Sequence, residues 1–165
     1  MLRPRLSHLE RRNFMKTLEE LHKIREEKRR ELDLRVNTKA DVREKHILVC
    51  HGTGCTSSKS PEILENFRRI LKEKKIDNVR VIKTGCFGLC AKGPIVIIRP
   101  EDTFYANVTP EDCEEIIESH IVEGKIVERL LCKDIDGTKV KSLDELNFYK
   151  KQKRIALKNC RSYKS

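Results

Sequence analysis

Four of the seven cysteines in this chain of 165 residues form two closely spaced pairs. Cys50 and Cys55 have the spacing C-x4-C, and Cys86 and Cys90 have the spacing C-x3-C, with 30 residues between the two pairs. Thiolates at such spacings are typical ligands of zinc and of iron–sulfur clusters. The odd number of cysteines also favours metal binding over a disulfide framework.

The residue types around these pairs favour one of several thiolate chemistries. Structural zinc usually takes cysteine pairs within compact knuckles, whereas one of the two loops here is longer. A thioredoxin-like disulfide enzyme would need C-x-x-C, which the chain lacks. A Rieske centre would need two histidines, and only His51 lies next to these cysteines. The residues therefore favour a [2Fe–2S] cluster on four thiolates, and a zinc-stabilised interaction module remains the alternative.

The other cysteines and histidines are interpreted as structural or free side chains. Cys113 lies on the apolar face of a predicted helix, as a small buried hydrophobic residue would. Cys132 and Cys160 follow Cys90 by 42 and 70 residues and are predicted to be free thiols. The histidines without a partner at metal-ligand spacing are His8, His22, His46 and His120.

Strands and helices alternate around the two cysteine pairs. Short apolar runs predict strands at residues 46–50, 79–83, 94–98 and 103–108, of which the last two form a hairpin. A helix opened by a capping Ser60 and Pro61 follows the first strand. A final helix begins near Thr109. The predicted fold is an α/β domain with the order β-α-β-β-β-α.

This order predicts where the cysteines meet. If the first two strands are parallel neighbours, both cysteine loops leave the same carboxyl edge of the sheet, where open α/β sheets generally hold ligands. Glycines flank the cysteines and would let amide N–H groups approach sulfur closely. These glycines are Gly52, Gly54, Gly85, Gly88 and Gly93.

Charge is concentrated at the two ends of the chain. The formal net charge is +10, yet residues 46–130 carry 12 basic and 13 acidic residues, so their net charge is −1. A nucleic-acid-binding module would be expected to concentrate its basic patch on the folded domain, so nucleic acid is not a predicted partner. No apolar run approaches the ~20 residues of a membrane helix, and the N-terminus lacks the apolar core of a secretory signal. We therefore expect a cytoplasmic protein without a membrane span.

The first segment is predicted to be a charged helix. Ser7 and Glu10 have the spacing of a capping box. Phe14, Leu18 and Leu21, followed by Ile24, then form one narrow apolar stripe at helical spacing. Such a stripe suits a solvated extension, or packing against a partner subunit or against the domain that follows.

The motifs C-H-G-T-G-C at 50–55 and T-G-C-F-G-L-C-A-K-G-P-I-V-I-I at 84–98 resemble the thioredoxin-like [2Fe–2S] ferredoxins and the equivalent domains of NADH dehydrogenases and hydrogenases. The resemblance covers about residues 45–130. It implies a thioredoxin-like fold, a [2Fe–2S] cofactor, and Cys50, Cys55, Cys86 and Cys90 as its ligands.

The flanking segments resemble the start of the flavoprotein (β) subunit of NADH-dependent, electron-bifurcating iron hydrogenases. The resemblance implies three parts, which are a helical extension (1–44), the ferredoxin domain (45–130) and a basic linker or truncated start of a flavoprotein domain (131–165). We expect residues 45–130 alone to fold and keep the cluster.

The resemblance also implies a one-electron carrier between a flavin or NADH site and other iron–sulfur centres. Its partners would be flavoprotein, hydrogenase or NADH dehydrogenase subunits, and self-association is also compatible with the sequence. The chain contains no G-x-G-x-x-G and no P-loop, so FMN and NADH sites are not transferred to it, and no catalytic site is assigned to this chain alone. A fragment, a short form of such a subunit and a stand-alone ferredoxin all fit these features.

Overall fold

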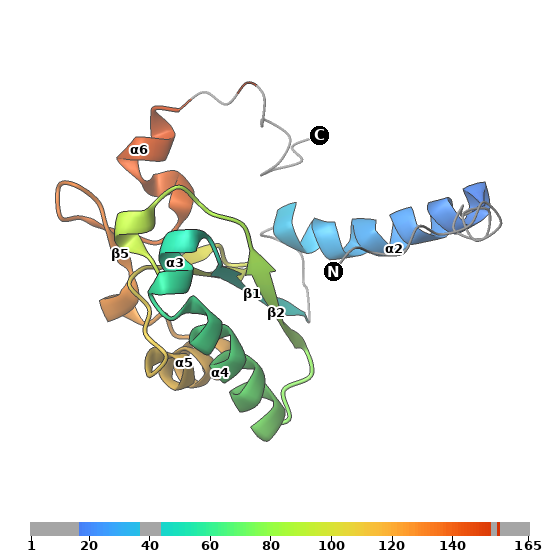
Figure 1. The fold of residues 1–165 in the computed structure, drawn as a ribbon, viewed down its shortest axis with the longest axis horizontal. Coiled ribbons are helices and arrows are strands. Elements are labelled where there is room, and N and C mark those ends of the chain that lie inside the picture. Colours follow the sequence, from blue (N-terminus) through green and yellow to red (C-terminus); the bar gives the residue numbers. More distant parts are fainter. Residues whose placement is uncertain (1–16, 37–43, 153–154, 156–165) are drawn as a thin grey trace, which may run out of the picture. The chain divides into compact units, whose positions relative to one another are not determined.

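A computed structural model describes residues 17–36, 44–152 and 155 (Figure 1). The chain divides into two compact units, Met1–Asp33 and Leu34–Ser165. The predicted capping box at Ser7 and Glu10, the stripe residue Phe14 and the thiol of Cys160 all lie outside the described residues. Among the helices of the described ranges, none has both the length and the apolar character that crossing a membrane requires.

The N-terminal unit contains most of the helix α2, Leu18–Val36. Reciprocal hydrogen bonds open this helix, because the Thr17 N–H donates to Glu20 Oε2 (2.8 Å) and the Glu20 N–H donates to Thr17 Oγ1 (3.2 Å). This is the geometry of a capping box. Leu18 and Leu21, two residues of the predicted apolar stripe, are 73% and 51% exposed.

The second unit is built on a four-stranded sheet with the order β2-β1-β3-β4. Its strands are β1 (Lys45–Cys50), β2 (Val79–Thr84), β3 (Val96–Arg99) and β4 (Thr103–Tyr105). β1 runs parallel to β2 and antiparallel to β3, and β3 and β4 form an antiparallel hairpin. The predicted parallel neighbours and the predicted hairpin are therefore confirmed.

The fourth strand ends three residues earlier than the apolar run predicts. Beyond Tyr105, the backbone amides bond to other segments of the domain instead of to β3. The Ala106 N–H donates to the Leu130 carbonyl (2.9 Å), and the Asn107 N–H donates to the Lys92 carbonyl (2.9 Å). Asn107 also has a positive φ of 51°, which turns the chain out of the strand direction.

Helices cover one face of the sheet. α4 (Ser60–Glu73) connects β1 to β2, and α5 (Asp112–Glu115) continues as a π-helix, Ile116–Val122. We call the apolar cluster between these helices and the sheet the helix-side core. Its members include Ile47, Val49, Ile63, Phe67, Ile70, Val96, Ile98, Tyr105, Cys113, Ile116 and Ile117. The predicted inner face of the last helix is thus buried, although part of that helix has π geometry.

The other face of the sheet carries a second apolar cluster, which we call the cysteine-side core. It consists of Leu48, Cys50, Cys55, Ile95, Ile97, Phe104, Ala106, Cys132, Val140, Leu143 and Leu146. Four of these residues lie beyond residue 130, in a segment with a small hairpin, β5 (Cys132–Lys133) and β6 (Lys139–Val140). A 3-10 turn (Leu143–Glu145) and α6 (Asn147–Lys150) follow the hairpin.

The segment 131–152 therefore differs from the predicted linker, because it packs on the four-stranded sheet. The Phe104 N–H donates to the Lys141 carbonyl (2.7 Å), and Cys132, Val140 and Leu146 are all at least 95% buried. Val140, Leu143 and Leu146 recur every three residues, but they lie on a short strand, in a 3-10 turn and just before α6, so they do not form one face of a continuous helix. Their spacing alone therefore does not show that they belong to a core.

Candidate metal centre

The two cysteine loops leave the sheet at the same edge, as the strand order predicted. Cys50 is the last residue of β1 and lies opposite Thr84, the last residue of β2. The Cys50 N–H donates to the Ile95 carbonyl (2.9 Å), and the His51 N–H donates to the Thr84 carbonyl (3.1 Å). The ladder therefore extends to the point where both loops begin, with Cys86 two residues further along the second loop.

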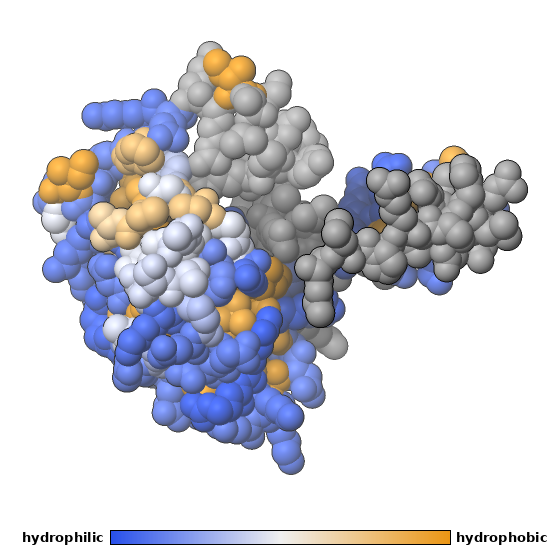
Figure 2. Space-filling model, in the orientation of Figure 1, coloured by the Kyte–Doolittle hydropathy of each residue, from blue (hydrophilic) through white to orange (hydrophobic). Residues whose placement is uncertain are grey.

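Each loop carries its second cysteine on a short helical turn. Cys55 lies on α3 (Thr53–Ser57), in which the Thr56 N–H donates to the Gly52 carbonyl (2.9 Å). Cys90 begins the 3-10 turn Cys90–Lys92. In Figure 2, the surface over α3 and this turn is white to pale orange, and so less hydrophilic than the blue surface around it.

The four thiols differ in their exposure to solvent. Cys50 and Cys55 are each 1% exposed and belong to the cysteine-side core. Cys86 and Cys90 are exposed, and their sulfur atoms are 4.0 Å apart. One side of the candidate centre is thus enclosed by protein, and the other faces solvent.

Glycines allow the two loops to approach closely. A Cβ atom on Gly52, in the first loop, would lie 2.9 Å from Cys86 Cβ in the second loop. A Cβ atom on Gly93 would lie 2.7 Å from Cys55 Sγ. Distances below 3.0 Å leave no room for a methyl group, so a larger residue at either position would force the neighbouring cysteine to shift.

The thiols also lie within one another's electrostatic field. Burial, together with the hydrogen bond and charge of Cys50, raises the pKa of Cys55 to about 12. The hydrogen bond and charge of Cys86 raise the pKa of Cys90. Four thiolates in one place repel each other, and a bound cation is the natural compensation for such repulsion.

The thiols lie as two pairs. Cys50 and Cys55 are both buried in the cysteine-side core, and Cys86 Sγ lies 4.0 Å from Cys90 Sγ at the surface. Within the part of the chain that the structure describes, no group of three or more His, Cys, Asp or Glu side chains is arranged to hold a metal ion. A [2Fe–2S] cluster contains two irons and takes four thiolates, so two adjacent pairs of thiols suit its donor set.

The structure also shows where the remaining sequence candidates lie. Cys113 is buried in the helix-side core, where its Sγ donates to the Ile63 carbonyl (3.7 Å). Cys132 is buried in the cysteine-side core, where its Sγ donates to the Lys133 carbonyl (3.6 Å). His51 Nδ1 lies 3.3 Å from Ser60 Oγ, in agreement with its interpretation as a loop side chain.

Two residues at the site were not recognised from the sequence. Ser60, predicted as the cap of α4, donates its hydroxyl hydrogen bond to the Cys50 carbonyl, while Lys59 takes the capping position with a φ of 66°. Tyr149, from the predicted linker, donates a hydrogen bond to the Phe87 carbonyl inside the Cys86–Cys90 loop. Neither bond has a local sequence signature, because its partners are 10 and 62 residues apart.

Comparison with known proteins identifies the family. A 2Fe-2S ferredoxin of Clostridium pasteurianum is 45% identical over 94 residues, which are 52% of this chain and 92% of that protein. A 2Fe-2S ferredoxin of Aquifex aeolicus is 36% identical over 97 residues, which are 53% of this chain and 87% of that protein. Among solved structures, a thioredoxin-like [2Fe–2S] ferredoxin from Aquifex aeolicus is 32% identical, with a TM-score of 0.49, and the match covers 53% of this chain and 88% of that chain. The family model "Thioredoxin-like [2Fe-2S] ferredoxin" matches residues 36–120. From this match and these relatives, the chain belongs to the thioredoxin-like [2Fe–2S] ferredoxin family, a family of electron carriers, and its cofactor is a [2Fe–2S] cluster.

Proposed function

We propose that Cys50, Cys55, Cys86 and Cys90 hold the cluster and that this chain relays single electrons within a hydrogenase or NADH dehydrogenase complex. The observation that carries the ligand assignment is the convergence of the two cysteine loops at one sheet edge. The family model ends at residue 120, so Cys132 lies outside the matched region, whereas all four proposed ligands lie within it.

When bound, the cluster supplies a one-electron couple, since two ferric ions, two sulfides and four thiolates carry a charge of −2 and one added electron makes it −3. All-thiolate ligation favours a low potential, near the ~−400 mV of plant-type ferredoxins. The Gly88 N–H donates to Cys86 Sγ at 3.3 Å, and such donation to a ligand sulfur raises the potential. The protein thus tunes the couple through its own amide groups.

The difference in thiol exposure sets the direction of electron exchange. Cys50 and Cys55 are buried against the sheet, whereas Cys86 and Cys90 reach the surface. A redox partner therefore approaches the cluster from the Cys86–Cys90 side. The buried pair keeps solvent from the opposite side and holds the centre on the rigid end of β1.

The redox partner is proposed to be a flavoprotein that takes hydride from NADH and delivers electrons singly. This part of the proposal rests on the resemblance of the flanking segments to flavoprotein subunits of iron hydrogenases. Exposed lysines, among them Lys150 and Lys151, lie in the segment that packs near the proposed exit side. Basic residues around an electron exit suit a partner with an acidic surface, and this attraction weakens as salt is added.

Iron and sulfide analysis of seven cysteine variants tests the ligand assignment. Replacing any one of Cys50, Cys55, Cys86 or Cys90 by Ala should lose or cripple the cluster. The matched controls are Cys113→Ala, Cys132→Ala and Cys160→Ala, which should keep the iron content of the unaltered chain. Full iron and sulfide in Cys86→Ala would overturn the assignment.

Reduction experiments test the relay. Dithionite should reduce the purified protein by one electron and give the rhombic S = 1/2 signal of a reduced [2Fe–2S] centre. NADH alone, with or without FMN, should leave the visible spectrum unchanged, because a bound flavin must first accept the hydride and pass its two electrons on one at a time. Adding a flavoprotein with an NADH site should restore reduction, at a rate that falls with salt. Bleaching by NADH without a partner would contradict the proposal that a separate flavoprotein oxidises NADH.

A further inference from the structure

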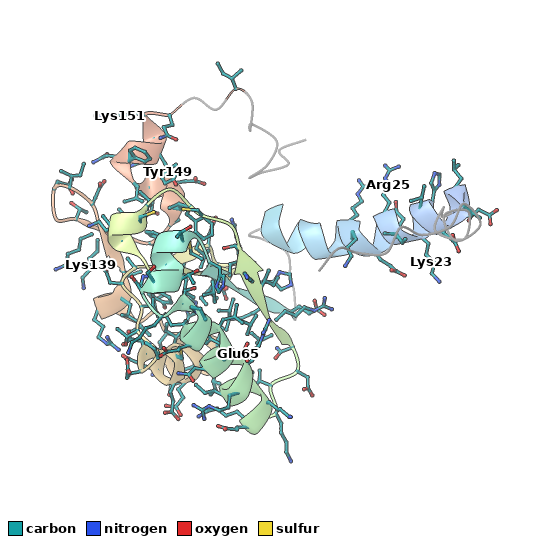
Figure 3. The ribbon with its side chains drawn as sticks, in the orientation of Figure 1. Lys23, Arg25, Glu65, Lys139, Tyr149 and Lys151 are labelled. Carbon is teal, nitrogen blue, oxygen red and sulfur yellow. The ribbon has the colours of Figure 1, made fainter. Side chains whose placement is uncertain are left out.

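Tyr149 connects the C-terminal segment to the loop between Cys86 and Cys90. It lies on α6 (Figure 3), and its hydroxyl donates a hydrogen bond to the Phe87 carbonyl. Tyr149 and Phe87 both pack against the cysteine-side core. The residue is 29 positions beyond the end of the family match, so family membership assigns it no role.

The carbonyl that Tyr149 contacts belongs to the peptide group that also contacts a proposed ligand. The Phe87 carbonyl and the Gly88 N–H are the two ends of one planar peptide. Its N–H donates to Cys86 Sγ at 3.3 Å, while its C=O accepts from Tyr149. Gly88 has a φ of +82°, a conformation that favours glycine, so the loop backbone itself is adapted to this orientation. A hydrogen bond at the carbonyl end therefore helps to fix where the N–H end points.

The segment that carries Tyr149 is firmly attached to the domain. The Asn147 N–H donates to Asp134 Oδ2 (2.9 Å), which ties the start of α6 to the β5–β6 hairpin. Glu145 accepts hydrogen bonds from the N–H groups of Lys141 (2.7 Å) and Ser142 (3.3 Å), in a capping box. Leu146, immediately before α6, is buried in the cysteine-side core. The hydroxyl of Tyr149 is thus presented to the loop by an anchored element.

We propose that Tyr149 is a positioning residue that orients and polarises the Phe87–Gly88 peptide toward Cys86 Sγ and so raises the reduction potential of the cluster. Hydrogen bonds in a chain polarise one another, so donation to the carbonyl strengthens the N–H as a donor. A stronger N–H donor to sulfur stabilises the reduced state, which carries more negative charge. The inference rests on the proposed function, because it requires Cys86 to be a ligand.

Redox titration of Tyr149→Phe in the full chain tests this role. This substitution keeps the ring and removes only the hydroxyl. The equilibrium constant for reduction should fall about threefold to tenfold, where a tenfold change for one electron corresponds to about 59 mV. The g values of the reduced centre should shift as well, because the electron density on Cys86 Sγ changes. A potential equal to that of the unaltered protein would overturn the inference.

Tyr105→Phe is the matched control. The Tyr105 hydroxyl is likewise hydrogen-bonded, with His120 Nδ1 (2.8 Å) and the Val127 N–H (3.1 Å), but it is buried in the helix-side core. Its loss should lower the free energy of unfolding without moving the potential or the g values. Equal changes of the potential in Tyr105→Phe and Tyr149→Phe would mean that general loosening of the domain is responsible, and would overturn the positioning role.

If Tyr149→Phe does not retain its cluster, a change that is expected to raise the reduction potential still tests the inference. Incorporating 3-fluorotyrosine at all three tyrosines makes each phenol a stronger donor and should raise the potential. A potential that stays unchanged or falls would contradict the inference.

The Cys86→Ala result distinguishes a failure of the ligand assignment from a failure of the role proposed for Tyr149. If that variant keeps a full cluster, the ligand assignment has failed. If it loses the cluster while the tyrosine changes leave the potential unchanged, only the role of Tyr149 has failed.

Discussion

Ser60, the first residue of α4, donates its hydroxyl hydrogen bond to the backbone carbonyl of Cys50, the last residue of β1. Both residues are buried. The Cys50 N–H donates at the same time to the Ile95 carbonyl (2.9 Å), so the backbone of this proposed ligand is held on both sides. The start of a helix thereby fixes the position of a thiol that precedes it by ten residues.

Ser60→Ala should destabilise the domain by about 1–3 kcal/mol, because it leaves the buried Cys50 carbonyl without this donor. Ser57→Ala is the control, since Ser57 Oγ also donates to a backbone carbonyl, that of Thr53 (3.2 Å), but is exposed. The control should change the free energy of unfolding by less than about 0.5 kcal/mol. Urea titration of the two variants gives both values. Equal changes in the free energy of unfolding would mean that the buried hydrogen bond contributes no more than the exposed one.

Gly52→Ala should reduce cluster content, because its methyl group would lie 2.9 Å from Cys86 Cβ. The backbone of Gly52 has a φ of −71°, which alanine adopts readily, so the effect would be steric. Gly54→Ala is the matched variant, since its methyl group would make an ordinary contact of 3.6 Å with Cys90 Cβ. Iron analysis should show a loss for Gly52→Ala only. A full cluster in Gly52→Ala would show that the loops separate more easily than the structure indicates.

Residues 44–152 should fold and hold the cluster better than residues 45–130. The shorter chain lacks Val140, Leu143 and Leu146, which are buried beside Cys50 and Cys55. The structure thus leads to the opposite of the expectation drawn from the sequence that residues 45–130 suffice. Iron content and thermal unfolding of the two trimmed chains check this, with the full chain as the reference. If both trimmed chains are equally stable and hold equal iron, the expectation from the sequence that residues 45–130 suffice would be correct.

The stability of the domain should fall as the pH falls below about 6.5, because of His120. Burial lowers the pKa of this histidine from 6.5 to about 4; the Glu101 carboxylate opposes this shift, whereas Lys45 and Lys141 add to it. The unfolded chain therefore binds a proton that the folded chain excludes, and stability is lost as the pH falls from 6.5 toward 4. Between pH 7.5 and 5.5, this one group should cost about 1 kcal/mol.

His120→Asn tests the assignment of this pH dependence. The asparagine oxygen replaces Nδ1 as the acceptor for Tyr105 Oη, which lies 2.8 Å from Nδ1. Asparagine does not titrate, so the difference in stability between the variant and the unaltered protein should narrow as the pH is lowered. Urea titrations at pH 7.5 and 5.5 measure it. A constant difference would mean that His120 is not the group responsible.

Local patterns in the sequence were sufficient to predict the sheet and the cysteine positions. The apolar run at residues 46–50 marks a buried strand, because burial on both faces requires continuous apolar residues. Residues 79–83 mark the edge strand β2, in which Arg80 and Lys83 are exposed. Chain connectivity then restricts how the strands pair, and the structure confirms that β1 and β2 are parallel neighbours. The four cysteines follow the ends of these strands, so their approximate meeting place also follows from the sequence.

Contacts between distant residues were decided only by the tertiary structure. The pairing of Tyr149 with Phe87 joins positions 62 residues apart, and no spacing rule relates them. Val140 and Leu146 are buried in the cysteine-side core. The sequence does not show that this face of the sheet is available to them. The need for glycine at position 52 arises from Cys86, which approaches it from another loop. The sequence by itself determined the local elements and the donor atoms, since both depend on neighbouring residues. The enclosure of those donors depends on packing, which becomes defined only when the whole domain has folded.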